Sequence, residues 1–375
     1  MEAFRIKNGI SATRYLGSNG TETAGSGGYS LAGASYDSKS FSVSGQDTSP
    51  KELFFKPDGT KMYVLGGSGG DVNEYNLSTA WDISTASYLQ NFVVSGQESN
   101  PEGVFFKPDG TKMYITGGSG DDINEYNLST AWDVTTASYN QNFSVANPDP
   151  KQVFFKPDGT KMFVIGAGSG VGTTYEYALS TSWDISTASY TQSFSVSTQD
   201  TSPESFFFAP DGNKMFVMGA ANDTVYEYSL STAWDLSTAS YTQGFGVSTQ
   251  EGGPKGVSFK SDGTKMYVIG SSTDTIYQYS TVGYTQALDL STGTTFSFTP
   301  SGATTVTFTN PPATGIAIGF SVEIVGDASV ITWPSSIKWH LATAPTATAT
   351  KELYTFVTTD GGTTYYGKKA AEAIA

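Results

Sequence analysis

Acidic and amide side chains gather in short glycine- and serine-rich segments that recur along the chain. Carboxylates and amides supply the hydrogen-bond donors and acceptors that can hold the hydroxyl groups of a sugar. Loops on a rigid scaffold often carry recognition, although loop sequences also vary where the fold leaves them unconstrained. We predict a binding surface for a saccharide or a similar polar ligand, formed by Asp71, Glu98, Asp121, Asp122, Asp200, Asn222, Asp223 and Asp274.

The sequence offers few residues for covalent or metal-assisted catalysis. His340 is the single histidine and cysteine is absent, so no Ser-His-Asp set in a nucleophile elbow and no His/Cys zinc site is indicated. The composition does not exclude hydrolysis by a pair of carboxylates, because the chain has 35 Asp and Glu residues. No feature of the sequence identifies a particular pair. We therefore predict a protein that is not an enzyme and uses no cofactor.

Calcium is the metal that the acidic turns could suggest. Asp58 and its repeats lie in Pro-Asp-Gly segments, which turn chemistry explains without a metal. The clusters GGSGGD and GGSGDD lack the ordered ligand spacing of a calcium loop. We predict no metal site.

An internal repeat provides the elements that must position these loops. The segment FFKPDGTKMYVLGG at 54–67 returns four more times, and one phenylalanine position recurs every 51 residues. The first four copies have the pattern strand, Pro-Asp-Gly turn, strand, glycine-rich loop, strand, tryptophan-containing connection and strand. The fifth copy has Ser-Asp-Gly at the turn and loses the tryptophan-containing connection. The strands are nearly continuous apolar runs, as expected for a sheet covered on both faces. Four strands in about 50 residues are typical of a β-propeller blade.

The copies predict an all-β fold, a five-bladed β-propeller with four-stranded blades, over residues 29–284. The segment 35–43 matches the fourth strand of a blade and could close the ring from the N-terminal side. Residues 283–286 also resemble a fourth strand, so closure from the C-terminal side is the alternative. The five inner strands are expected to begin near Leu53, Val104, Val153, Ser205 and Val257.

In a four-stranded meander, the loops between blades and the loops after each second strand emerge on one face of the ring. The third repeat changes length in both kinds of loop, which favours this face for binding. The Pro-Asp-Gly turns and the tryptophans lie on the opposite face.

The tryptophans, such as Trp81, are expected to pack between blades, with sugar stacking as the alternative. Lys61 and Glu74 are expected to form a cross-strand ion pair that recurs in the other blades, with a charged site as the alternative.

Two further segments flank the propeller. Residues 285–375 contain short predicted strands divided by Gly, Pro and Asn, and indicate a β-sandwich-like or jelly-roll-like domain. Residues 1–28 carry Arg5, Lys7 and Arg14 ahead of a glycine-rich stretch, and we interpret them as a docking arm on a tether, with a frayed terminus as the alternative. This segment lacks the apolar core of a signal peptide.

The net charge of −15 argues against a nucleic-acid partner and against anionic lipid surfaces, which attract basic patches. No stretch has the length and apolar character of a membrane span, so we expect no membrane insertion.

Two resemblances add to this interpretation. The run F-x-P-D-G-T-K-M-Y-V resembles the repeats of lactonase-like and surface-layer-type β-propellers, and that similarity concerns the fold. MEAFRIKNGISATRYLG at the start, with ITWPSSIKW and DGGTTYYG near the end, is similar to segments of phage virion proteins. NLSTAWDISTASY resembles repeats in fibre-like structural proteins of marine bacteriophages.

The second resemblance implies a tail fibre or similar virion appendage, assembled in the host cytoplasm and exposed on the particle. It implies a homo-oligomer that contacts other virion proteins through its arm and a host-surface glycan through its loops. The alternatives are a polysaccharide depolymerase or lactonase-like hydrolase, and a purely architectural capsid decoration protein. The residues expected to dock on the virion are Phe4, Arg5, Ile6, Lys7, Arg14 and Tyr15.

Overall fold

The computed structural model describes residues 29–31, 34–145, 149–166, 172–281, 284–298, 304–325, 331–340, 345 and 351–372. The chain divides into two compact units, Ser30–Thr281 and a unit that contains the C-terminal part from 282 onward. Each unit has its own hydrophobic core. The predicted docking residues lie outside the described residues, so their role stays a prediction; they are Phe4, Arg5, Ile6, Lys7, Arg14 and Tyr15.

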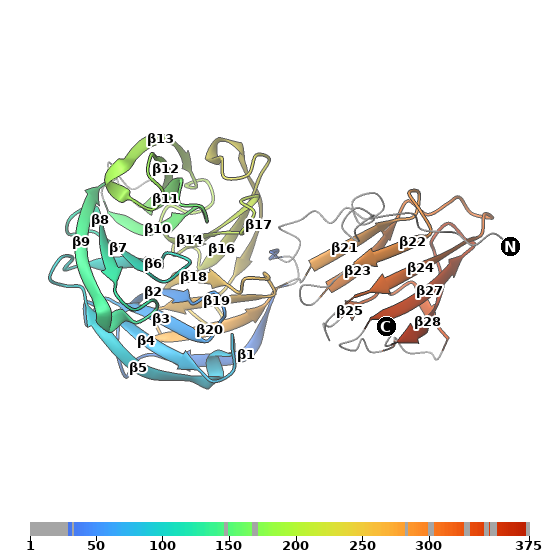
Figure 1. The fold of residues 1–375 in the computed structure, drawn as a ribbon, viewed down its shortest axis with the longest axis horizontal. Helices are drawn as coiled ribbons and strands as arrows, with labels where there is room; N and C mark the ends of the chain where they lie inside the picture. The colour runs from blue at the N-terminus through green and yellow to red at the C-terminus, as the bar shows by residue number, and fades with distance from the viewer. Residues whose placement is uncertain are drawn as a thin grey trace. The chain divides into compact units, whose positions relative to one another are not determined.

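The first unit is a five-bladed propeller of four-stranded antiparallel sheets (Figure 1), as the repeat predicts. Blades one to four each follow the chain from the inner to the outer strand, with a short 3-10 helix before the last strand. Blade one contains β2 (Pro50–Phe55), β3 (Lys61–Gly66), β4 (Asp71–Leu77), η1 (Ile83–Thr85) and β5 (Ala86–Val93). Blade two contains β6 (Pro101–Phe106), β7 (Lys112–Gly117), β8 (Asp122–Leu128), η2 (Val134–Thr136) and β9 (Ala137–Ser144). Blade three contains β10 (Pro150–Phe155), β11 (Lys161–Gly166), β12 (Thr173–Leu179), η4 (Ile185–Thr187) and β13 (Ala188–Ser195). Blade four contains β14 (Pro203–Phe208), β15 (Lys214–Gly219), β16 (Thr224–Leu230), η5 (Leu236–Thr238) and β17 (Ala239–Gly246).

Blade five closes the ring with a strand from the N-terminal side. Its sheet has the order β1-β20-β19-β18, built from β1 (Ser35–Ser42), β18 (Pro254–Phe259), β19 (Lys265–Gly270) and β20 (Thr275–Ser280). The alternative closure is wrong, because the segment beginning at Tyr284 pairs within the C-terminal unit instead. The first and last blade are thus joined by hydrogen bonds between distant parts of the chain.

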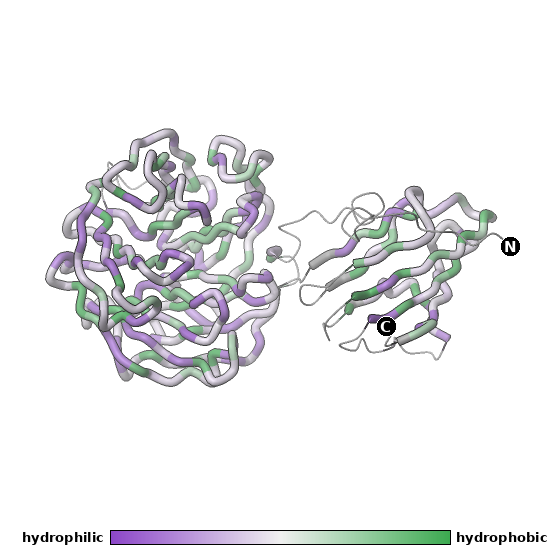
Figure 2. Tube along the Cα trace, viewed as in Figure 1, coloured by the Kyte–Doolittle hydropathy of each residue, from purple (hydrophilic) through white to green (hydrophobic). Residues whose placement is uncertain are grey.

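The blades bury each other's apolar faces. Tyr63 and Leu65 of β3 pack in one cluster with Phe106 and Trp132 of blade two, and similar clusters join the other neighbouring blades. Figure 2 shows apolar stretches along the strands and hydrophilic stretches in the surrounding loops. An isolated blade could not bury these residues, so the closed ring supplies most of the hydrophobic stabilisation.

The predicted turn chemistry and tryptophan packing are both confirmed. Asp58 Oδ1 accepts hydrogen bonds from Thr60 N at 3.0 Å and Thr60 Oγ1 at 2.7 Å, and Gly59 has a φ of 73°. The next blade's Trp132 is 9% exposed and stacks against Phe106, while its carbonyl accepts the hydroxyl of Tyr63 in blade one at 2.7 Å. The tryptophan therefore fastens one blade to the preceding one and is not a free sugar platform.

Replacing Gly110 with alanine is expected to lower the free energy of unfolding by about 2 kcal/mol. Gly110 has a φ of 74°, and an added Cβ would overlap the indole of Trp132. Urea unfolding measures the loss. The matched control is Gly96→Ala, where the added Cβ meets nothing within 4 Å, and a cost equal to that control would contradict the role given to Gly110.

The C-terminal unit contains two sheets that share one core, consistent with the predicted β-sandwich-like domain. Consecutive strands from β21 to β26 alternate between a three-stranded sheet, ordered β21-β23-β25, and a five-stranded sheet, ordered β22-β24-β27-β28-β26. Several of the pairs are parallel. The strands are β21 (Tyr284–Asp289), β22 (Thr295–Phe298), β23 (Thr304–Thr309), β24 (Ile318–Ile324), β25 (Ile331–Thr332), β26 (Ile337–Trp339), β27 (Glu352–Thr358) and β28 (Tyr365–Glu372).

Candidate functional site

The loop face of the propeller is the face with the inter-blade loops and the turns that join each second strand to the third. The antiparallel order of every blade places these two kinds of loop together and the Pro-Asp-Gly turns at the other end. In the third blade both loops include residues outside the described ones, namely 146–148 and 167–171.

Two of the predicted binding residues brace this face from within. Glu98 is fully buried, and its carboxylate accepts the backbone N–H of Asn100 at 2.6 Å and of Ser119 at 3.2 Å. Asp200, 2% exposed, accepts the N–H of Ser202 at 2.8 Å in the same way. Each acid ties an inter-blade loop to the turn of the following blade, and Asp47 and Glu251 repeat the arrangement.

Asp71 and Asp122 are also buried, each 6% exposed. The Asp71 carboxylate accepts the side-chain amides of Asn73 at 2.8 Å and Asn91 at 2.5 Å, and so bridges β4 and β5. Asp122 forms the equivalent pair of bonds in blade two. Because both carboxylates are buried and hydrogen-bonded within their blades, they stabilise the scaffold and are little exposed to a ligand.

The other four predicted residues lie closer to solvent. Asp121, Asp223 and Asp274 are half-buried and occupy left-handed turn positions, with φ of 48°, 47° and 50°, and Asn222 is exposed. These residues come from blades two, four and five, so the structure distributes the eight predicted side chains around the ring and does not gather them at one point. Their contact with a ligand stays a prediction.

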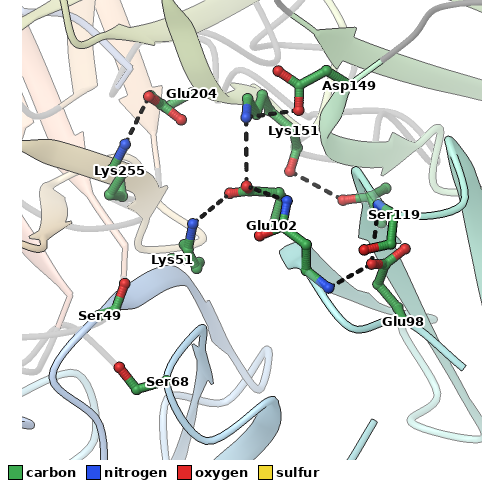
Figure 3. Close-up of polar contacts among 12 residues, drawn as sticks. Ser49, Lys51, Ser68, Glu98, Glu102, Ser119, Asp149, Lys151, Glu204 and Lys255 are labelled. Atoms are coloured by element: carbon green, nitrogen blue, oxygen red, sulfur yellow. Dashed lines mark hydrogen bonds and ion pairs between the residues drawn. The ribbon is translucent and has the colours of Figure 1, made fainter. Parts of the chain in front are cut away.

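A charged cluster that the sequence analysis did not single out lies where the five inner strands meet. The second residue of each inner strand is charged, and the sign alternates around the ring (Figure 3). The members of this axial cluster are Lys51, Glu102, Lys151, Glu204 and Lys255. The signal was present in the aligned repeats as Pro-Lys, Pro-Glu, Pro-Lys, Pro-Glu and Pro-Lys, at the point where each inner strand leaves its loop.

Ion pairs link the axial cluster across blade boundaries. Glu102 accepts Lys51 Nζ at 3.0 Å and Lys151 Nζ at 3.5 Å, while Glu204 accepts Lys255 Nζ at 2.8 Å. The side chains are largely buried, from 7% exposed for Glu102 to 24% for Lys255. Burial alone would lower the pKa of Lys151, but its hydrogen bond to Asp149 and the charge of Glu102 outweigh burial and raise that pKa.

An odd number of blades prevents complete alternation. Inner strands β18 and β2 are neighbours in the ring, and both present lysine at this position, so Lys255 and Lys51 follow one another with no carboxylate between them in the cluster. Each of these two lysines already binds a glutamate on its other side, Lys51 to Glu102 and Lys255 to Glu204. Like charges on neighbouring strands repel, and a further anion near both would relieve that repulsion. This step of the axial cluster is therefore its most suitable point for an anionic group.

A second polar layer follows along the same strands. Glu52 is 1% exposed; its carboxyl accepts Ser205 Oγ at 2.5 Å and the N–H of Leu53 at 2.9 Å, and Gln152 also bonds to it. Burial raises the pKa of Glu52 to about 8, although these hydrogen bonds lower it, so the carboxyl is protonated at neutral pH. A Cβ at Gly256 would overlap Glu52, so glycine makes room for a side chain that reaches from blade one to blade five.

The recurring ion pair between second and third strands is confirmed. Lys61 and Lys112 bind the buried carboxylates of Glu74 and Glu125. Blades three and four contain the pairs Lys161–Glu176 and Lys214–Glu227, both at 2.7 Å. In blade five, where Gln278 replaces the glutamate, Lys265 binds Asp37 of the closing strand at 2.7 Å.

Among the described residues, no three His, Asp or Glu side chains converge as ligands for a metal ion. Over the same residues the chain contains no helix with the length and apolar character needed to cross a membrane.

The strands define the class of this protein: an all-β chain with a five-bladed propeller of four-stranded sheets and a C-terminal domain of mixed β-sheet. No protein-family model and no curated protein matches the sequence.

Solved structures with distant similarity include a β-propeller domain, a gluconolactonase and a protein of unknown function. A functionally unknown protein of Desulfotomaculum acetoxidans is 14% identical, covering 59% of this chain and 62% of its own, with a TM-score of 0.38. The periplasmic gluconolactonase PpgL of Pseudomonas aeruginosa is 16% identical over 53% of this chain and 54% of its own, with a TM-score of 0.36. The propeller domain of Cps50 (Swd1) from Myceliophteria thermophila is 9% identical, covering 66% of this chain and 99% of its own, with a TM-score of 0.39. This chain thus spans less than two thirds of the first two proteins.

Proposed function

We propose that this protein is a non-enzymatic, glycan-binding component of a virion appendage such as a phage tail fibre. The observation that carries the binding function is the axial cluster, in particular the adjacent lysines Lys51 and Lys255. A carboxylate or sulfate on a host-surface glycan would be held between these two ammonium groups. The exposed amide of Asn222 and the half-buried carboxylate of Asp223, both on the loop face, would hydrogen-bond the sugar hydroxyls around it.

Rigidity of the loops supports a binding role. Four buried acids, Asp47, Glu98, Asp200 and Glu251, hold inter-blade loops to neighbouring turns through backbone N–H groups. Loops that are fixed before binding lose little conformational entropy when a ligand arrives, which favours affinity. A surface of this kind suits repeated, weak recognition of a polysaccharide.

The virion setting rests on the resemblance of both ends and of the repeats to phage structural proteins. In this proposal the basic arm, with Arg5, Lys7 and Arg14, attaches the protein to other virion proteins, and copies of the chain associate with each other. Gold-labelled antibodies against the propeller, applied to purified virions that encode this chain, should label one fixed position on the particle. Virions without any label would overturn this part of the proposal.

Binding is tested with the purified full chain on an array of neutral and acidic glycans. We expect binding to acidic glycans, and we expect Lys51→Gln to weaken that binding at least tenfold. This variant should keep its fold, because Glu102 retains its ion pair with Lys151. The matched control is Lys107→Gln, which removes the same charge from a Pro-Asp-Gly turn on the opposite face. No glycan binding, or equal binding by both variants, would refute the role of the axial cluster.

A hydrolase is the second candidate, and Glu52 is the observation that favours it. A carboxyl that is protonated at neutral pH, because its pKa is raised to about 8, is the group that general acid catalysis needs. Incubating the protein with the glycan that it binds separates the two functions. Released saccharide that disappears in Glu52→Gln would establish the hydrolase and overturn the non-enzymatic proposal.

A further inference from the structure

The C-terminal domain has a groove that the function proposed for the propeller does not use. Its volume is about 480 Å³, and it lies over β26, β27 and β28 of the five-stranded sheet. Carboxylates are absent from its lining, which consists of Lys338, Trp339, His340, Thr355, Phe356, Val357, Tyr366, Gly367 and Lys368.

The strand register places three of these side chains on one exposed face. β28 lies between β26 and β27, with Tyr366 opposite both Lys338 and Val357, and Lys368 opposite Thr355. Side chains two residues apart on a strand point the same way, about 7 Å apart. Lys338 and Lys368 are therefore both neighbours of the Tyr366 ring.

The two lysines are exceptional in this acidic chain. Every other described lysine forms an ion pair with a carboxylate. Lys338 and Lys368 are exposed and have no such partner among the described residues. The only two uncompensated lysines of the described chain thus share one groove. Because unpaired cations on a surface attract anions, the groove is suited to a negatively charged ligand.

The aromatic groups of the groove restrict the class of ligand. Tyr366 is 62% exposed, an unusual position for a large ring that gains free energy from burial. Trp339 is half-buried and is held in place by Trp333 at a centroid distance of 5.5 Å. Binding sites for small ligands commonly combine such apolar walls with a few well-placed polar groups. A flat sugar ring over Tyr366, with its carboxylate between the two lysines, would satisfy both features.

We propose that this groove binds an acidic saccharide of the uronic-acid class, independently of the propeller. A nucleic acid fits less well, because affinity for it comes from many phosphate contacts and this surface provides two lysines within a chain of net charge −15. The groove can hold one or two sugar units, and the lysines would select those that carry a negative charge.

Calorimetric titration of the full chain with a galacturonate oligosaccharide tests the site, and each variant is made in both the wild type and the Lys51→Gln background so that binding at the axial cluster does not mask binding in the groove. The double variant Lys338→Gln/Lys368→Gln should weaken binding at least tenfold, and Tyr366→Ala should weaken it to a similar extent. All three side chains are exposed, so the fold should be retained. A neutral malto-oligosaccharide should bind no more tightly to the wild type than to the double variant.

Two controls separate this site from the others. Lys56→Gln/Lys156→Gln removes the same charge from two propeller turns and should leave galacturonate binding in the groove unchanged. Lys51→Gln should also leave galacturonate binding in the groove unchanged. The experiment can therefore refute the binding role of the axial cluster without refuting that of the groove, and the reverse. Unaltered affinity in the double variant, absence of galacturonate binding, or tighter binding of an oligonucleotide that the double variant abolishes would each overturn the proposal.

Discussion

Replacing Glu74 with alanine is expected to lower the free energy of unfolding of the propeller by about 3–5 kcal/mol. Glu74 is fully buried and pairs with Lys61, and its second oxygen accepts Gln90 Nε2 at 3.0 Å and the N–H of Val134 at 3.2 Å. The last bond crosses to the next blade. Removing the carboxylate therefore takes an acceptor from a partly buried ammonium group, an amide and a backbone N–H. The ammonium group keeps only the carbonyl of Trp132, and the amide keeps Asp133.

The effect of Glu74→Ala should be measured by urea unfolding, with hydrogen exchange resolved by peptide so that the propeller is followed separately. Lys107→Ala is the matched control, because it breaks an ion pair whose two side chains are 25% and 51% exposed. Pairs as exposed as this one are worth less than about 1 kcal/mol. A Glu74→Ala variant that unfolds at the same urea concentration as this control would contradict the structural role of the buried carboxylate.

The propeller could be predicted because its determinants are local and repeated. Pro-Asp-Gly sets the turn within four residues, and the apolar strands on both sides of it need neighbours on both faces. Once five copies are counted, ring closure requires only one more strand. Even so, the acid that completes the ion pair in blade five could not be predicted, because Asp37 lies more than 200 residues before its partner Lys265.

The loop acids show where residue type misleads. Asp and Glu are rarely buried without partners, so Glu98 and Asp200 were predicted on the surface. In the structure each is enclosed by the N–H groups of a turn that lies about twenty residues further along the chain. These N–H groups form charge-assisted hydrogen bonds that offset the cost of burying the carboxylate. Only the folded position of the turn distinguishes a loop brace from a ligand contact.

The axial cluster and the C-terminal groove were missed for a related reason. Lys51 and Lys255 are separated by most of the propeller in sequence, and only closure of an odd-numbered ring makes them neighbours. In the C-terminal domain, parallel pairing brings Lys338 beside Tyr366, although neither the strand pattern nor the spacing specifies which strands pair. Parallel partners are non-local by nature, since they require a crossover between them.

Replacing Glu52 with glutamine is expected to stabilise the propeller at pH 8 by about 4 kcal/mol while changing its stability little at pH 4. The ordinary pKa of 4.5 applies to the unfolded chain, and burial raises the pKa to about 8 in the folded protein. Below pH 4.5 the carboxyl is protonated in both states. Between these values the unfolded chain releases its proton while the folded protein retains it, so the stability of the wild type falls as pH rises.

Glutamine cannot ionise, so the variant should lack this part of the pH dependence, which amounts to about 1.4 kcal/mol per pH unit within the window. Its amide can donate to Ser205 Oγ and its carbonyl can accept the N–H of Leu53, so the hydrogen bonds of the buried layer are retained. Urea unfolding of both proteins from pH 4 to pH 9 gives the difference at each pH.

Asp58→Asn provides a control for the Glu52 experiment, because the pKa of Asp58 is lowered in the folded protein whereas that of Glu52 is raised. Burial is the largest single influence and raises the pKa of Asp58, but the hydrogen bonds from Lys56 and Thr60 together outweigh it and lower that pKa to about 2. Because this carboxyl is ionised in both states between pH 5 and pH 8, its variant should differ from the wild type by a constant amount over that range. If Glu52→Gln also gave a constant difference there, Glu52 would not be the protonated group near the propeller axis. The hydrolase alternative would then lose its proposed acid.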